Sequence, residues 1–105
     1  MKKQSARTKP YYSKAVINKL VKNNKAYITD AAKKTAFKSF GWNFELIKKA
    51  IASLPYKYWY KSEKRFDNPE IWVDYYRAYG LMGENVYTHF YVEEEALIID
   101  SFKEI

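Results

Sequence analysis

The spacing of apolar residues changes at Pro55, and this change constrains the fold more than any other feature of the chain. Before Pro55 the apolar residues recur every three or four positions, as they do along one face of an α-helix. After Pro55 they alternate with polar residues, which is typical of β-strands with one buried face. The pattern predicts an α+β domain, with N-terminal helices packed on one face of a sheet.

The first half of the chain is predicted to form three helices and one short strand. Ser13, Thr29 or Asp30, and Asn43 are suited to cap the helices at their N-termini, and Gly41 is suited to end the second helix. The expected elements are a helix over residues 13–23, a strand over 25–29, a helix over 30–40 and a helix over 43–54.

The second half is predicted to form four strands, over residues 56–66, 70–79, 85–92 and 96–105. Short connections at Asp67–Pro69, Gly80–Asn85 and Glu93–Glu95 make these strands antiparallel neighbours. The sheet is therefore expected to be mostly antiparallel, with four to six strands. We find no repeat and no linker, and expect residues 1–105 to form a single domain.

Several classes of site and location are excluded by composition. The chain has no cysteine and one histidine, so disulfides, thiolate zinc sites and sites built from several histidines are excluded. Glu93, Glu94 and Glu95 are expected to form a solvated turn, because consecutive carboxylates on a strand point to alternate faces. The first ten residues lack the apolar run of a secretory signal, and no segment approaches the roughly 18 apolar residues of a membrane span. We expect a cytoplasmic protein with no metal, no cofactor and no membrane contact.

Positive charge is concentrated in the first part of the chain. Residues 1–64 carry 16 lysines and arginines against three acids, and residues 65–105 carry three against nine, so the net charges are +13 and −6. One interpretation is an electropositive face that attracts a polyanion, with nucleic acid the leading candidate. The other is a set of helices coated with solvated lysines. Charge alone does not decide between them.

The residue types on the predicted strands suit RNA cleavage without a metal. Eleven of the 20 aromatic residues are tyrosines, interleaved with lysine and arginine. RNA supplies its own nucleophile, the 2′-hydroxyl, so a protein needs to assist proton transfer and to stabilise the phosphorane. Cations can stabilise the phosphorane. Tyrosine or histidine can assist proton transfer if neighbouring lysines lower the pKa of the tyrosine. DNA lacks the 2′-hydroxyl and would be bound without being cut.

Four segments in the second half resemble, in order and spacing, the MqsR-type toxins of bacterial toxin–antitoxin pairs. They are "YKS" at 60–62, "IWVDYYR" at 71–77, "NVY" at 85–87 and "SFKE" at 101–104. The resemblance implies a RelE-like fold, sequence-selective cleavage of single-stranded mRNA, and a cognate antitoxin.

The same resemblance implies functional roles for Lys61, Tyr87 and Lys103, with Tyr60 beside the first of them. The two lysines are assigned to phosphate binding and phosphorane stabilisation, and Tyr87 to proton transfer or substrate orientation. Which residue is the general base and which the general acid stays open. Val73 stands where the family can carry a glutamine, a departure that bears on base preference and on activity.

Strand alternation adds His89 to the candidates. If Tyr87 faces the active surface, His89 and Tyr91 share its face, while Val86, Thr88, Phe90 and Val92 point to the core. His89 is then either part of the site, a surface residue, or the partner of a neighbouring carboxylate.

Arg77 is a further candidate for phosphate contact, because its guanidinium fork suits that geometry. Two other functions fit the sequence. One is a non-catalytic nucleic-acid-binding module, and the other is a protein-binding partner that pairs through an exposed sheet edge.

Overall fold

The computed structural model describes residues 7–105, which form an α+β domain. Lys2 and Lys3, which contribute to the basic first part of the chain, lie outside the described residues. The first half contains the predicted elements: α1 (Lys14–Lys22), β1 (Ala26–Ile28), α2 (Asp30–Phe40) and α3 (Phe44–Ala52).

Each helix begins at a predicted cap. The side chains of Ser13, Thr29 and Asn43 accept hydrogen bonds from backbone N–H groups in the first turns of α1, α2 and α3. Gly41 ends α2 with a left-handed backbone, φ 71°, which glycine adopts without a steric penalty. Local sequence therefore accounts for the helix boundaries.

The second half contains the four predicted strands with shifted ends. A 3₁₀ turn, η1 (Tyr56–Tyr58), takes the place of the first residues of the predicted 56–66 strand. The strands are β2 (Trp59–Lys64), β3 (Trp72–Leu81), β4 (Glu84–Glu93) and β5 (Ala96–Glu104).

Two connections between the strands are shorter than the sequence indicates. Met82 and Gly83 alone join β3 to β4, and Glu94 and Glu95 join β4 to β5. All four have positive φ, as two-residue hairpin turns of the primed type require. The expected Gly80–Asn85 link was too long, because the ladder between β3 and β4 continues to the pair formed by Leu81 and Glu84.

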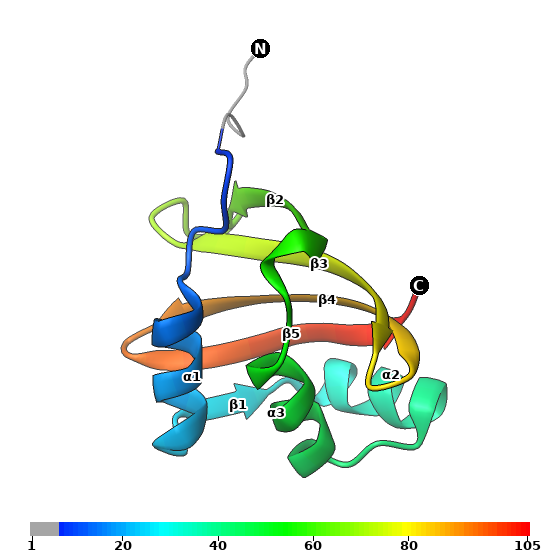
Figure 1. Cartoon of the computed structure of the whole chain (residues 1–105). Helices are drawn as coiled ribbons and strands as arrows, with labels where there is room; N and C mark the ends of the chain where they lie inside the picture. The colour runs from blue at the N-terminus through cyan, green and yellow to red at the C-terminus, as the bar shows by residue number, and fades with distance from the viewer. Residues whose placement is uncertain (1–6) are drawn as a thin grey trace.

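The five strands form one sheet in the order β1-β5-β4-β3-β2 (Figure 1). β1 pairs with β5 in parallel, and the other neighbours are antiparallel. The sheet is therefore mostly antiparallel, as predicted, with β2 and β1 at its edges.

The three helices cover one face of the sheet. Their buried residues, including Ile17, Ala36 and Ile47, pack with strand residues such as Phe90 and Phe102 in one apolar core. Alternation places Tyr75 and Arg77 of β3, and Tyr87 and His89 of β4, on the opposite face, as predicted. We call this second face the open face.

A β-bulge in β2 turns Lys61 toward the open face. Trp59 pairs with the core residue Tyr76, and Lys61 pairs with Tyr75, so Tyr60 is an extra residue between two paired positions. In a regular strand, residues two apart share a face, and Lys61 would point to the same side as Trp59. The extra residue reverses that orientation.

A second bulge, at Asp100 in β5, has the same effect on Lys103. Asp100 lies between Ile99 and Ser101, which are both paired with β4. Ile99 and Phe102 are both fully buried in the core, although three positions separate them, and Lys103 is exposed on the open face. Without the extra residue, regular alternation from Ile99 would direct Lys103 into the core.

Half of the 16 lysines and arginines in the basic first part of the chain lie on the helices. Eight of its lysines belong to α1, α2 and α3. The open face carries fewer cations, among them Lys61, Arg77 and Lys103. The positive charge of the first part is therefore spread well beyond the open face, and the charge asymmetry of the sequence does not locate the candidate site. Among residues 7–105, no helix is long and apolar enough to cross a membrane.

Candidate active site

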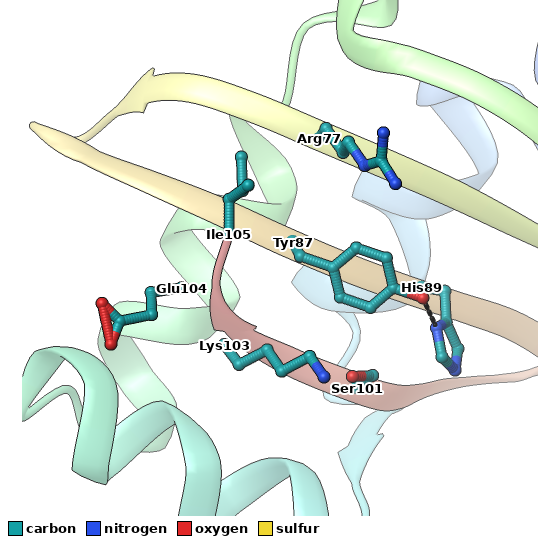
Figure 2. Close-up of a pocket in the computed structure, with 7 residues that line it drawn as sticks. All are labelled: Arg77, Tyr87, His89, Ser101, Lys103, Glu104 and Ile105. Atoms are coloured by element: carbon teal, nitrogen blue, oxygen red, sulfur yellow. Dashed lines mark hydrogen bonds between the residues drawn. The ribbon is translucent and has the colours of Figure 1, made fainter.

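The candidate site is a shallow depression on the open face, with a volume of about 420 Å³. Figure 2 shows its side chains projecting from β3, β4 and β5. The lining residues are Arg77, Tyr87, His89, Ser101, Lys103 and the two residues at the C-terminal end, Glu104 and Ile105. Cationic, phenolic and imidazole groups thus surround one small space.

Two rows of paired residues cross the strands at this site. Arg77, Tyr87 and Lys103 form one row, from β3 to β5. The neighbouring row begins at Lys61 on β2 and continues through Tyr75, His89 and Ser101. Because adjacent strands lie about 4.8 Å apart, side chains distant in sequence meet within one or two strand spacings.

All six residues proposed from the sequence lie on the open face, including Tyr60. The Arg77 guanidinium carbon lies 4.5 Å from the centre of the Tyr60 ring. The Lys61 Nζ lies 4.5 Å from the Tyr75 ring centre and 3.3 Å from Glu63 Oε2. Each cation therefore contacts an aromatic face, and Lys61 is also paired with the Glu63 carboxylate.

Tyr87 is held between a lysine and the histidine. The Lys103 Nζ lies 5.5 Å from the centre of the Tyr87 ring. The Tyr87 hydroxyl lies 2.8 Å from His89 Nδ1, the hydrogen bond drawn in Figure 2. On the other side of the imidazole, Nε2 lies 3.6 Å from Asp100 Oδ2. His89 therefore contacts both Tyr87 and the carboxylate of Asp100, as the alternative of a neighbouring carboxylate partner anticipated.

Burial raises the pKa of the Tyr87 phenol to about 12, and the neighbouring phenols of Tyr60 and Tyr75 add to the shift while Arg77 opposes it. The condition stated for the tyrosine, that neighbouring lysines lower its pKa, is therefore not met at Tyr87, where burial outweighs the attraction of Arg77. Burial also lowers the pKa of His89, although Asp100 opposes that effect. At neutral pH the phenol keeps its proton and the imidazole is neutral.

A buried carboxylate supports the site from the core side. Asp74 accepts hydrogen bonds from the backbone N–H groups of Tyr11, at 3.0 Å, and Tyr12, at 2.9 Å. It also accepts one from the hydroxyl of Ser62, which in turn accepts one from Trp59 Nε1 at 3.0 Å. Asp74 thereby ties the segment before α1 and the edge strand β2 to β3.

Val73 lies on the open face and is only 6% exposed. It pairs with Glu63 across β2 and β3, beside the row that contains Lys61 and Tyr75. An apolar, desolvated side chain thus occupies the position at which the family can carry a glutamine. Its side chain has no hydrogen-bonding group.

The sequence missed three contributors to the site: Tyr75, Asp100 and Ser101. Tyr75 was assigned to the correct face, and its position between Lys61 and His89 follows from that register. Asp100 and Ser101 both flank His89 because of the bulge in β5, which no sequence pattern indicated. Within residues 7–105, no group of three or more histidine, aspartate or glutamate side chains is arranged to hold a metal ion.

Comparison with known proteins identifies the family. No curated protein matches the chain. The family model described as "Motility quorum-sensing regulator, toxin of MqsA" matches residues 9–104, nearly the whole chain. That match includes Tyr60, Lys61, Arg77, Tyr87, His89 and Lys103, whereas Ile105, which also lines the depression, lies one residue beyond it. The chain therefore belongs to the MqsR toxin family and is a toxin of a toxin–antitoxin system, with a cognate antitoxin as its partner.

Proposed function

We propose that the protein is a metal-independent, sequence-selective endoribonuclease that cleaves single-stranded mRNA. The observation that carries the proposal is the convergence of Lys61, Tyr87 and Lys103, which come from three strands, on one open face. Two bulges are needed to bring the lysines there, and bulges are frequent beside active sites because they re-aim side chains.

In the proposed reaction, the ribose 2′-oxygen attacks the adjacent phosphorus, and the bond from phosphorus to the 5′-oxygen breaks. Lys61 and Lys103 stabilise the negative charge that builds up on the phosphorane. Tyr87 takes part in proton transfer. Tyr60, Arg77 and His89 bind the RNA, through a stacking surface and charged or hydrogen-bonding groups.

The test is to incubate the pure protein with a defined transcript in the presence of EDTA and to map the new ends. We expect 2′,3′-cyclic phosphate ends at recurring sequences. A transcript with a single 2′-deoxynucleotide at a mapped site should stay intact at that site, because the nucleophile is missing.

Lys61→Ala and Tyr87→Phe should each lower the cleavage rate by ~10²-fold or more, as expected when a charge stabiliser or a proton-transfer group is lost. Tyr91→Phe is the matched control, since it removes the same hydroxyl from the same strand, four residues away from Tyr87. Circular dichroism should be native for all three variants. Wild-type rates in both site variants would contradict the proposal.

A non-catalytic nucleic-acid-binding module would behave differently in the same assay. It would bind RNA with a steep salt dependence and leave every transcript intact. Growth arrest on expression, relieved by the co-expressed antitoxin, is expected for the nuclease.

A further inference from the structure

We propose that Tyr87, His89 and Asp100 form a proton relay in which His89 is the base that removes the proton from the RNA 2′-hydroxyl, acting through the Tyr87 phenol. The relay rests on the proposed ribonuclease function and identifies the general base, which that function leaves open. It changes the role of His89 from RNA binding to catalysis through Tyr87 and gives Asp100 a positioning role.

The geometry sets the direction of the hydrogen bond between Tyr87 and His89. A carboxylate only accepts, so Asp100, with Oδ2 at 3.6 Å, favours the tautomer of His89 that carries its proton on Nε2. Nδ1 is then an acceptor, and the Tyr87 hydroxyl at 2.8 Å donates to it. The phenol oxygen retains lone pairs for a second hydrogen bond. The RNA 2′-hydroxyl is the donor that we assign to it.

The state of the phenol explains why a second group is needed. With its pKa raised to about 12, Tyr87 is not ionised at neutral pH and is a weak base alone. The imidazole beside it has a lowered pKa and is neutral at pH 7, ready to accept a proton. The His89 side chain is 21% exposed, so solvent can still exchange protons with it.

The proton transfers balance as follows. As the bond from the 2′-oxygen to phosphorus forms, the 2′-hydroxyl proton passes to the Tyr87 oxygen, and the phenol proton passes to His89 Nδ1. The departing 5′-oxygen takes a proton from a water molecule. The hydroxide that remains removes the extra proton from the imidazolium, and the relay returns to its starting state.

Asp100 stabilises the imidazolium that forms during the reaction, as the carboxylate does in a Ser-His-Asp triad. The other groups that face His89 are Tyr75 of β3, whose ring centre lies 4.8 Å away, and the cations Lys61 of β2 and Lys103 of β5. Both lysines lower the pKa of His89, and Asp100 raises it. The carboxylate is therefore needed to keep the imidazole basic between two ammonium groups.

Kinetics as a function of pH test the relay. The wild-type rate should fall at acid pH, where His89 becomes protonated. His89→Gln should lower the plateau rate by ~10²-fold and remove this limb. Asp100→Asn should lower the plateau by about 10-fold and move the limb to lower pH, because the group that raises the pKa of His89 is lost. A role confined to structure would change the rate without moving the limb.

The single histidine permits a test that needs no substrate. In a ¹⁵N NMR spectrum at neutral pH, the only imidazole of the chain should carry its proton on Nε2. Asp100→Asn should lower the pKa measured from this resonance, and Tyr87→Phe should remove the hydrogen bond to Nδ1 and shift the Nδ1 signal. Asp67→Asn, which makes the same chemical change at an exposed site, should shift neither.

The outcomes separate the two proposals. If wild-type protein cuts the transcript, Lys61→Ala does not, and His89→Gln retains the wild-type rate and pH profile, the relay is overturned and the ribonuclease assignment stands. A proton on Nδ1 at neutral pH would also overturn the relay. If the wild-type protein cuts no RNA, both proposals fall.

Discussion

Replacing Asp74 by alanine should destabilise the protein by about 3 kcal/mol. The carboxylate accepts from two backbone N–H groups and from Ser62, and the substitution leaves these three donors without their partner. A buried donor without a partner costs ~1–3 kcal/mol. Water can reach part of the space near Tyr11, which lowers the cost of that unpaired donor. Removing the buried Asp74 charge also recovers some of its desolvation cost, so the total destabilisation is roughly 2–4 kcal/mol.

Urea and thermal unfolding, followed by circular dichroism, measure this loss. For a domain of this size, 3 kcal/mol corresponds to a fall in Tm of roughly 10–20 °C. Asp67→Ala is the control, because Asp67 is an exposed acid paired with Arg65 and should leave Tm close to the wild-type value. A variant Asp74→Ala within ~1 kcal/mol of wild type would show that the three hydrogen bonds contribute little net stability.

The pH dependence of protein stability tests the role of Asp74 in a second way. Burial raises the pKa of Asp74 above its ordinary value of 3.8, despite the hydrogen bonds it accepts. Between 3.8 and the raised value the folded state binds more protons than the unfolded state, so this group's contribution to stability falls as pH rises. The cost of Asp74→Ala should therefore be larger at pH 4 than at pH 7. The opposite trend would mean that the hydrogen bonds outweigh desolvation.

Two further substitutions probe binding and the core. Arg77→Ala should weaken RNA binding and reduce the slope of log affinity against log salt concentration by about one. Arg77→Lys should keep the wild-type slope. Filter binding at several salt concentrations measures the slope for both variants. An unchanged slope in Arg77→Ala would remove this residue from the phosphate contacts. Phe102→Ala should cost ~3–5 kcal/mol in urea unfolding, because the ring is fully buried between the sheet and the helices. A loss below ~1 kcal/mol would contradict the core position.

Local sequence accounts for most of the secondary structure. Ser13, Thr29 and Asn43 start the helices, and Gly41 ends α2, because capping depends on residues within one turn. Period-two alternation likewise predicts from the sequence that His89 shares the face of Tyr87. The prediction is confirmed because β4 contains no bulge between these two residues. The basic composition was a poorer guide, because half of the cations in residues 1–64 are lysines on the helices, away from the site.

Tertiary structure decided the parts of the site that depend on pairing. The parallel addition of β1 to β5 joins residues about 70 positions apart, and no local pattern specifies such a contact. The bulges at Tyr60 and Asp100 depend on which residues of neighbouring strands pair, yet they determine whether Lys61 and Lys103 point to the open face or to the core.

The sequence by itself determined the fold class, the helix limits and the residue types available for chemistry, because these depend on short-range periodicity and capping. Only the folded protein decided how those groups behave. The pKa of Tyr87 rises because neighbouring strands desolvate the phenol, and His89 gains a carboxylate partner because Asp100 bulges toward it. Desolvation and cross-strand distance depend on the whole packed structure, and so no single segment of the sequence contains them.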